Sequence, residues 1–596
     1  MTTLTRRTAT ALGFAALAAP AAALAQSPAD QRFAGLAARY IDQALALQPI
    51  FATQQGDHRF DDQVDDVSAA GVARQVALAR RLLAEAEALR PAELTRENQV
   101  DLEVLKNQLR YGVWTDEVLQ SWAWDPQIYS SAAGNALFGL MSRDYAPRPQ
   151  RLRAAIARME KLPAFLAQAR AQLQPARVPA IHAETVAKQN GGVMSIVDSM
   201  ITPFASDLDA AGQARLKAAT AMLKAAMAEH QVWLDKTLVP AAKGEFRLGA
   251  KLYDQKLAFA LCSPQSRAEI RRLAEAEVRA SRAEMYQLSA RILQGRPGAP
   301  AAPPNPDPAT EQTVIEAALE LVYADRPTRE GLVEANKAGL AEATRFVRTK
   351  DLITLPDAPV EVILMPEYAR GAAVAYCDPP GPLDKGQKTF YAVSPIPEDW
   401  TADQAASFLR EYNRREIHDI AIHEAMPGHF VQLWHANRHP STLRALLWSQ
   451  PFVEGWAVYA EDMMARQGYM DGDPLFRLQQ LKMRLRTITN AILDQMVHVD
   501  GASEAEVMRF LTVTAFQQER EAAGKWTRAR LDSTQLPAYF VGVSAHDQMR
   551  AEAQRREGAA FDLKRYHDRV TAFGSPNISW RTKRGGGEPN AVTLSW

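Results

Sequence analysis

A helical repeat of apolar residues runs through most of the chain and restricts it to a mainly α-helical fold. From Asp30 to about Leu293, apolar residues return every three or four positions in segments rich in alanine, leucine, glutamate and arginine. The repeat resumes over Glu311–Thr349 and again from Asp403 to about Arg530. The clearest segments each predict one helix, namely Val72–Leu89, Arg151–Leu173, Arg215–Leu238 and Ala268–Leu293.

Residues 359–395 break this repeat and predict a small sheet. Strands are expected at Val360–Leu364, Ala372–Cys377 and Thr389–Val393, directly before the helices that carry the candidate catalytic residues. The proline-rich stretch Pro297–Pro308 predicts a surface loop. We therefore expect a single catalytic unit over residues 26–596, with a helical lobe at about 30–295 and a catalytic lobe at about 309–596.

The N-terminus has the pattern of a targeting segment. Arg6 and Arg7 precede an apolar stretch from Ala11 to Leu24, which ends in the small-residue pattern Ala23-Leu24-Ala25. This pattern predicts a signal peptide over residues 1–25 and a periplasmic or secreted mature protein. The paired arginines fit a twin-arginine signal but lack the usual bulky residues after them, so an ordinary secretory signal is the alternative.

Charge and hydropathy exclude several classes of partner. Lysine plus arginine and aspartate plus glutamate both total 69, so no basic excess indicates nucleic acid or an anionic membrane surface. No apolar run after the leader is long enough to span a bilayer. The two cysteines, Cys262 and Cys377, favour buried small side chains over a disulfide.

The segment from Ile422 to Phe430 carries the strongest functional prediction. His423 and His429 are candidate zinc ligands, and Glu424 beside the first of them can accept a proton. In an unbroken helix the two histidines would point roughly 120° apart and lie about 9 Å apart along the axis. Pro427 and Gly428 can end or bulge the helix and bring the imidazoles together. The alternative is a buried polar cluster at a helix kink.

Glu454 is predicted to be the third metal ligand. It lies in an apolar helical segment, where an unpaired carboxylate would be costly and a cation would compensate it. Glu461 follows on the same face with Asp462 beside it, and both are candidates to hydrogen-bond the free nitrogens of the histidines. The alternative for Glu454 is an ion pair with a buried arginine.

These motifs carry a resemblance to a known family. The pattern H-E-A-x-P-G-H-x-x-Q, followed by E-G-W-A-x-Y-A-E, resembles the bacterial family called domain of unknown function 885. Gln432 supplies the glutamine of the motif, and weaker similarity extends over most of the mature chain. That family is grouped by its motif with the gluzincin metallopeptidases. The resemblance implies a large helical, metallopeptidase-like fold with a deep groove, and one zinc ion held by two histidines and a glutamate.

Together these residues predict a zinc hydrolase. Glu424 is expected to take a proton from the attacking water and pass it to the leaving amine. Tyr539 is the first candidate for the hydrogen-bond donor to the oxyanion, with His498 and His546 as further candidates. The alternatives are a packed tyrosine and, for His498, a surface pair with Asp494.

The expected substrate is a peptide or a small amide. Strand residues Ala372–Tyr376 could pair with an extended peptide, and the basic run at Lys482, Arg484 and Arg486 predicts either a solvated helix face or a clamp for a substrate carboxylate. Two other functions stay open, a zinc hydrolase of a non-peptide amide or ester and a non-catalytic periplasmic binding or scaffold protein. The sequence does not predict the oligomeric state.

Overall fold

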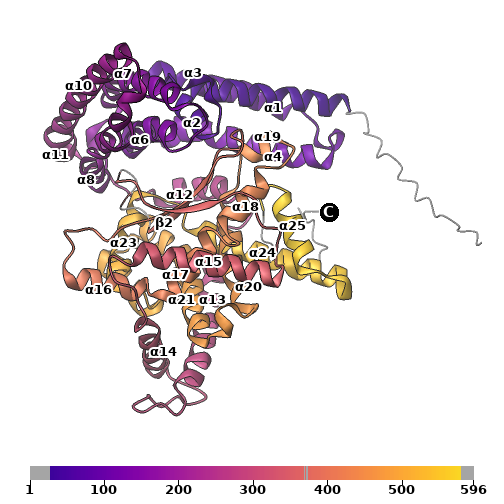
Figure 1. The fold of residues 1–596 in the computed structure, drawn as a ribbon. Helices are drawn as coiled ribbons and strands as arrows, with labels where there is room; N and C mark the ends of the chain where they lie inside the picture. Colours follow the sequence, from indigo (N-terminus) through magenta and orange to yellow (C-terminus); the bar gives the residue numbers. More distant parts are fainter. Residues whose placement is uncertain (1–26, 368–369, 371–373, 579–596) are drawn as a thin grey trace, which may run out of the picture.

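The computed structural model describes residues 27–367, 370 and 374–578 and shows a mainly helical chain with one small sheet (Figure 1). The predicted signal peptide lies outside the described residues. Within those ranges, no helix combines the length and the apolar content that crossing a membrane requires.

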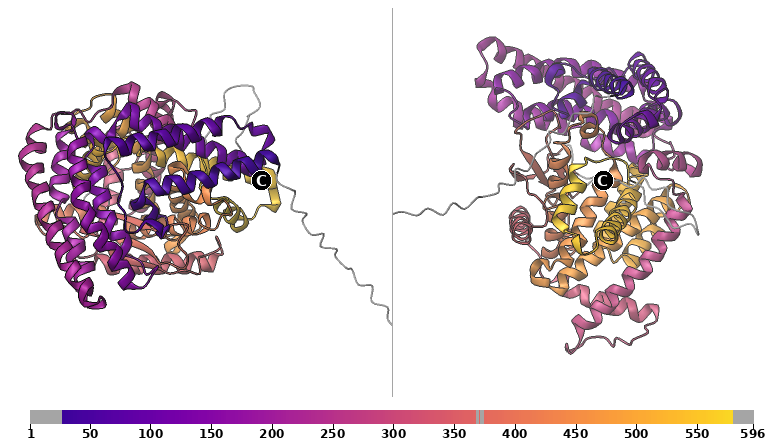
Figure 2. Two further views of the ribbon diagram at one scale, coloured as in Figure 1. Left: turned by 90° about the horizontal axis from the view of Figure 1, so that it is seen from above. Right: turned by 90° about the vertical axis from the view of Figure 1, so that its right-hand side faces the viewer.

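Residues 28–241 form a layer of helices at the top of Figure 1, and the right-hand view in Figure 2 shows the same layer above the rest of the chain. Its apolar residues form two cores, one from residues 50–242 and one from residues 29–109, which also includes Leu443 from the rest of the chain. Ser68, Thr95 and Asp209 cap helices of this layer by accepting hydrogen bonds from first-turn N–H groups. The helices are α1 (Pro28–Leu47), α2 (Pro49–Gln54), α3 (Ala69–Glu87), α4 (Arg96–Trp114), α5 (Ser121–Trp124), α6 (Gln127–Met141), α7 (Arg148–Gln172), α8 (Ala180–Gln189), α9 (Gly192–Ile196), α10 (Ala210–Trp233) and α11 (Val239–Ala241).

The rest of the chain forms a second body that carries the sheet. The predicted helical stretch over Glu311–Thr349 is two helices, because Pro327 lies in the break between them. Helices also continue beyond Arg530, where the predicted helical region ends. The helices are α12 (Gly249–Leu261), α13 (Arg267–Leu293), α14 (Pro308–Tyr323), α15 (Leu332–Lys350), α16 (Ala402–Glu411), α17 (Arg414–Glu424), α18 (His429–Ala436), α19 (Thr442–Leu446), α20 (Gln450–Arg466), α21 (Pro474–His498), α22 (Glu504–Arg509), α23 (Glu519–Leu531), α24 (Pro537–Glu557) and α25 (Leu563–Ala572).

The boundary between the two bodies lies before Gly249 and not at the proline-rich loop. Helices α12 and α13 share one hydrophobic core with α14, α21 and α24, so they belong to the second body. The loop before Pro308 instead joins α13 to α14 at the bottom of Figure 1. The proline-rich loop lies where it was predicted. The assignment of α12 and α13 to the first lobe is wrong, because a helical repeat does not show which other helices its apolar face packs against.

The small sheet lies beside α17. It contains β1 (Val360–Leu364), β2 (Ala375–Asp378) and β3 (Thr389–Val393) in the order β1-β3-β2, with β1 parallel and β2 antiparallel to the central strand. Residues 371–373, where the second strand was expected to begin, lie outside the described residues. The predicted sheet next to the candidate catalytic helices is confirmed, and β2 is one of its edge strands.

One buried and one partly buried ion pair attach the helical layer to the second body. Arg444 of α19 pairs with Asp101 of α4 at 2.6 Å, and both side chains are almost fully buried. Arg143 pairs with Asp378 at the end of β2 at 2.9 Å. These contacts fix the position of the layer over the sheet, and breaking a buried pair by removing one partner is strongly destabilising.

His58 forms a third attachment. Its Nδ1 lies 3.1 Å from Asp61, its Nε2 lies 3.0 Å from Asp384 in the β2–β3 loop, and its ring stacks on Tyr145. Burial lowers the pKa of His58, but hydrogen bonds to Asp384 and Asp61 outweigh it and raise the pKa to about 9. At neutral pH the imidazolium therefore holds the loop to the layer.

The stability that His58 contributes should depend on pH. Because the folded-state pKa is raised, the contribution is complete below about pH 6.5 and is lost as the pH rises through about 9. We expect His58→Gln to destabilise the protein by about 2 kcal/mol at pH 6 and by much less at pH 10. Denaturant unfolding at both pH values measures this difference. An equal loss of stability at both pH values would contradict this prediction. The matched control is His230→Gln. Burial lowers the pKa of that imidazole to about 4, so it is neutral at both pH values and its replacement should have the same effect at each.

Candidate metal centre

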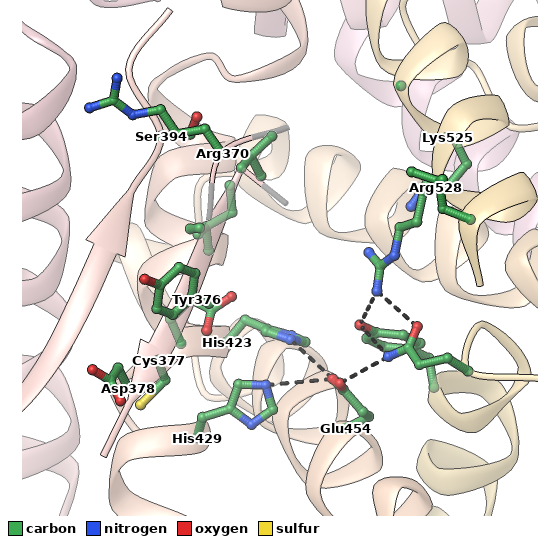
Figure 3. Close-up of a pocket in the computed structure, with 18 of the residues that line it drawn as sticks. Arg370, Tyr376, Cys377, Asp378, Ser394, His423, His429, Glu454, Lys525 and Arg528 are labelled. Carbon is green, nitrogen blue, oxygen red and sulfur yellow. Dashed lines mark hydrogen bonds and ion pairs between the residues drawn. The ribbon is translucent and has the colours of Figure 1, made fainter. Parts of the chain in front are cut away.

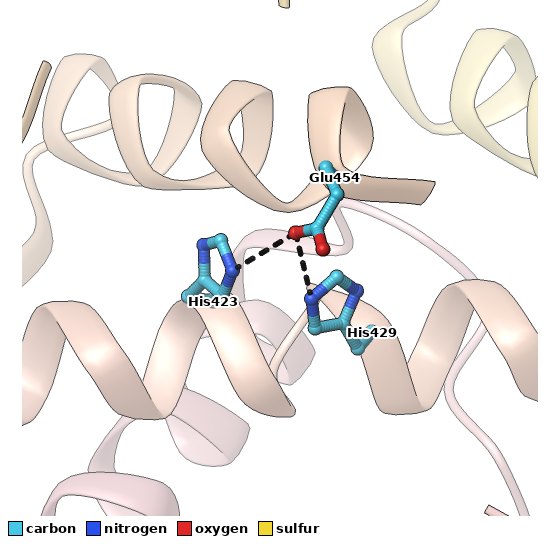
Figure 4. A group of neighbouring side chains, drawn as sticks. All are labelled: His423, His429 and Glu454. Atoms are coloured by element: carbon cyan, nitrogen blue, oxygen red, sulfur yellow. Dashed lines mark ion pairs between the residues drawn. The ribbon is translucent and has the colours of Figure 1, made fainter. Parts of the chain in front are cut away.

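His423 and His429 face each other because the helix is interrupted between them. Helix α17 ends at Glu424 and α18 begins at His429, so residues 425–428 form the connection. The Gly428 N–H donates to the carbonyl oxygen of Ile422 over 2.9 Å and folds the connection back onto α17. Figure 4 shows the two imidazoles on the same side, facing α20. The interruption predicted from Pro427 and Gly428 is confirmed.

Gly428 is required by a close approach of the backbone. A Cβ atom at this position would lie 1.9 Å from the carbonyl oxygen of His423 and 2.4 Å from that of Ile422. Neither oxygen can move without distorting the last turn of α17. The absence of a side chain at residue 428 therefore sets the distance between the two histidines.

Glu454 of α20 completes a group of three. Its Oε2 lies 3.7 Å from Nε2 of His423 and 3.5 Å from Nε2 of His429. The potential ligand atoms of the three residues all lie within 4.8 Å of one another. Oε2 is buried and has no hydrogen-bond partner among the described residues. An ionised oxygen buried between two imidazole nitrogens fits a divalent cation, which would satisfy all three groups at once.

The charges of the group reinforce one another. Burial raises the pKa of Glu454, but the two histidines outweigh it and hold that pKa well below its ordinary value. Burial lowers the pKa of His423, whereas the carboxylates of Glu454 and Glu461 raise it well above its ordinary value. The cluster therefore favours an ionised carboxylate that attracts positive charge.

Glu461 orients His423, whereas Asp462 does not reach either histidine. Oε1 of Glu461 accepts a hydrogen bond from Nδ1 of His423 over 2.6 Å, which leaves Nε2 free to face Glu454. Asp462 instead accepts from Arg466 over 2.5 Å and from Arg477 over 2.7 Å. Its predicted contact with the histidines is corrected, because consecutive helical residues point about 100° apart.

A glycine crossing positions Glu454 against α24. A Cβ atom on Gly455 would lie 2.2 Å from the carbonyl carbon of Gly542, and one on Gly542 would lie 2.0 Å from the carbonyl oxygen of Pro451. The two helices can touch only because both positions lack side chains. This contact brings Tyr539, one turn before Gly542, close to Glu454.

Gln535 links Tyr539 to the candidate ligand. Its side-chain N–H group donates to Oε1 of Glu454 over 3.3 Å and to the hydroxyl of Tyr539 over 3.2 Å. The ring of Tyr539 also stacks near that of His423, with centroids 6.3 Å apart. The predicted candidate Tyr539 therefore lies at the centre.

The three candidate ligands line a cavity of about 1150 Å³ between the helical layer and the second body. Glu424 and Tyr539 line the same cavity, and Glu184 and Lys188 of α8 contribute from the layer. In Figure 3 the strand residues Tyr376–Asp378 lie on one side of the candidate ligands and Arg528 lies on the other. The cavity is large enough for an extended ligand of several residues.

His498 and His546 are buried core residues outside the cavity lining, and Nε2 of each contacts backbone carbonyl oxygens. Nε2 of His498 contacts the carbonyl oxygens of Ala529 and Asp532 at 2.7 and 3.0 Å, and Nε2 of His546 contacts that of Phe452 at 2.9 Å. Both side chains are buried. The structure therefore corrects the prediction that His498 takes part in catalysis, and its surface pairing with Asp494 is also absent. Cys262 and Cys377 are unpaired thiols.

The predicted basic run does not form a solvated face, because Lys482 is buried and both arginines are half-buried. Lys482 pairs with Glu411 at 2.8 Å in the core, and Arg484 pairs with Glu277 at 3.0 Å. Of the three, only Arg486 lines the cavity. The run as a whole therefore does not form a clamp.

Comparison with known proteins identifies the family to which this chain belongs. A family model described as "Bacterial protein of unknown function (DUF885)" matches residues 49–579. The chain belongs to the DUF885 family. No curated protein sequence matches it.

Solved structures share the fold of this DUF885 chain. A predicted lipoprotein of unknown function from Shewanella oneidensis is 31% identical, with a TM-score of 0.74 over 91% of this chain and 98% of that one. A predicted lipoprotein from Colwellia psychrerythraea is 17% identical, with a TM-score of 0.71 over 92% and 97% of the two chains. The second likeness shows the fold alone. Both relatives match the DUF885 chain over nearly their full length.

Three residues that line the cavity of this DUF885 chain were not predicted from the sequence, namely Gln535, Lys525 and Arg528. Gln535 lies in the connection before α24, which begins at Pro537, so no helical spacing could have indicated it. Lys525 and Arg528 belong to a helix of mixed charge, which sequence alone cannot distinguish from an exposed helix.

Proposed function

We propose that this DUF885 protein is a zinc-dependent hydrolase of the gluzincin kind that cleaves amide bonds, most readily in short peptides. The convergence of Nε2 of His423, Nε2 of His429 and Oε2 of Glu454 in the wall of a large cavity carries the proposal. Two imidazoles and one carboxylate are a common ligand set of catalytic zinc, and they leave a coordination position open.

His423, His429 and Glu454 would hold the ion, and Glu461 would keep the proton of His423 on Nδ1. When bound, zinc supplies a Lewis acid that acidifies water and polarises a carbonyl group. The close approach at Gly428 supports this role, because it holds the two imidazoles in one arrangement before any ion arrives.

Glu424 is proposed to be the general base. It follows His423 directly, ends α17 and lines the cavity. Its carboxylate would take one proton from the attacking water and deliver it to the nitrogen of the leaving amine. The water oxygen joins the carbonyl carbon as the C–N bond breaks, so one water molecule is consumed for each bond cleaved.

Tyr539 is proposed to donate a hydrogen bond to the developing oxyanion. Its hydroxyl oxygen accepts from Arg528 and from Gln535, each over 3.2 Å. Because both neighbours act as donors, the tyrosine proton is free to be donated into the cavity. A donor aimed at the position where negative charge develops is typically worth a factor of about 10²–10³ in rate.

The edge strand β2 supports a peptide substrate. Its residues Ala375–Asp378 line the cavity, and the strand pairs with β3 on one side only among the described residues. The backbone groups on the other edge can pair with an extended chain. The leader-like N-terminus, together with the 31% identical relative described as a lipoprotein, supports action outside the cytoplasm, in the periplasm or after secretion.

Removal of the metal tests the function. We expect a chelator to lower peptide hydrolysis by at least about tenfold and one equivalent of zinc per chain to restore it. The assay compares short peptides with small amides and esters. Faster turnover of the small substrates would favour the hydrolase of non-peptide bonds, and no turnover of any substrate by the zinc-loaded chain would contradict the proposal.

A further inference from the structure

Helix α23 presents basic side chains to the cavity beside the candidate metal centre. Lys525 and Arg528, three positions apart on this helix, both line it, and Arg486 of α21 lines it nearby. Figure 3 shows Lys525 and Arg528 across the cavity from β2. The side chains that neutralise these cations decide whether the group is structural or is open to a ligand.

Arg528 has no carboxylate partner within ion-pair distance among the described residues. One of its terminal nitrogens donates to Oε1 of Gln535 over 2.8 Å and to the hydroxyl of Tyr539 over 3.2 Å. Both acceptors are neutral, and the carboxylates of Glu454 and Asp532 act on the guanidinium only from beyond ion-pair distance, so its charge has no carboxylate in direct contact at the cavity wall. Leaving a buried cation unpaired is costly, and an anionic ligand would remove the cost.

Lys525 and Arg486 share a single carboxylate. Oε1 of Glu521 lies 2.5 Å from Arg486 and 3.8 Å from Lys525, while its other oxygen accepts from Tyr412 over 2.7 Å. Burial, together with the neighbouring Arg486, lowers the pKa of Lys525 well below its ordinary value. Glu521 is therefore occupied by Arg486, and the charged form of Lys525 lacks a close carboxylate that would stabilise it.

Glu416 adds little negative charge to this group. It lies 3.8 Å from Arg486, but burial raises its pKa to about 8, so it is largely protonated at neutral pH. With the guanidinium groups of Arg486 and Arg528 beside one ionised carboxylate, Glu521, the wall has a surplus of positive charge next to the proposed reaction centre, and Lys525 adds a further hydrogen-bond donor.

We propose that Arg528, assisted by Lys525, binds the free terminal carboxylate of a peptide substrate, so that the hydrolase removes short fragments from the C-terminal end. This inference rests on the proposed function. Arg528 contacts Tyr539 and Gln535, and Gln535 contacts the candidate ligand Glu454. A carboxylate held by Arg528 would therefore lie close to the proposed oxyanion donor, with room for only a short segment between it and the cleaved bond.

A binding measurement separates the subsite from the catalytic proposal. The zinc-loaded full chain carrying Glu424→Gln is equilibrated with a mixed pool of N-acetylated hexapeptides as free acids, and with the same pool as C-terminal amides. We expect the acids to bind about 10- to 100-fold more tightly. In the same background Arg528→Gln should remove the difference and Arg528→Lys should keep part of it. Arg520→Gln, which changes a cavity arginine of α23 that stacks on Trp400, should leave it unchanged.

Equal binding of acids and amides, or binding of neither pool, would overturn the subsite. Thermal unfolding of the Arg528 variants checks that they are folded. Hydrolysis of the acid pool by the chain with Glu424 intact is read separately, and its products should be short C-terminal fragments. Acid-selective binding without any hydrolysis would overturn the catalytic proposal and leave the subsite standing. Products cut at internal positions, without regard to the free carboxylate, would overturn the C-terminal preference.

Discussion

Replacing Glu424 by glutamine is expected to lower the turnover number at least about a hundredfold while one zinc ion stays bound. Glutamine keeps the shape of the side chain but cannot accept a proton from the attacking water. Glu424 is not one of the three candidate ligands, so the metal content should not change. Steady-state kinetics on a cleaved peptide and metal analysis of the same preparation measure both quantities.

The control for Glu424→Gln is Glu361→Gln. Glu361 is an exposed carboxylate on β1 that pairs with Lys388, and its replacement should leave both turnover and metal content at the wild-type level. Near-normal turnover in the Glu424 variant would exclude it as the base. Loss of the metal from that variant would instead show that Glu424 belongs to the ligand set.

Gly428→Ala is expected to weaken zinc binding at least about tenfold and to destabilise the protein by about 1–3 kcal/mol or more. The new methyl group would overlap the carbonyl oxygen of His423, which is only 1.9 Å from the ideal Cβ position. The chain must then move His429 away from His423 or distort the end of α17. Competition with a chromophoric chelator measures the zinc affinity, and denaturant unfolding measures the stability.

Gly112→Ala is the matched control for the glycine variant. Gly112 lies inside α4 with open space around its Cβ position, so alanine should be neutral or stabilise the helix by up to about 1 kcal/mol. Wild-type zinc affinity in Gly428→Ala would mean that the distance between the histidines does not depend on this close approach.

The elements with a strong local signal could be predicted from the sequence. The helix predicted at Ala268–Leu293 is observed at Arg267–Leu293, and the first and third strands in the sequence, Val360–Leu364 and Thr389–Val393, have the predicted bounds. The same holds for the break between His423 and His429, because proline and glycine act on the backbone at their own positions. The hydrogen bond between Glu461 and His423 could also be predicted. Glu461 lies two helical turns after Glu454, so helix geometry alone places both side chains on the same face.

The remaining features depend on contacts between segments far apart in the chain. No local pattern showed that α13 packs on α21, or that the carbonyl groups of Ala529 and Asp532 would contact Nε2 of His498. The unpaired charge of Arg528 is visible only when all neighbouring carboxylates are placed. Side-chain partners across helices are set by tertiary packing, which a periodic repeat does not encode.

The metal content of the purified chain tests the central claim most directly. Metal analysis is made on the wild-type protein and on His423→Ala, His429→Ala and Glu454→Ala, each checked for folding by circular dichroism and thermal unfolding. The account predicts one zinc ion per wild-type chain and less than about a tenth of that in each folded variant. A wild-type chain that takes up no zinc, or folded variants that keep a full equivalent, would contradict it.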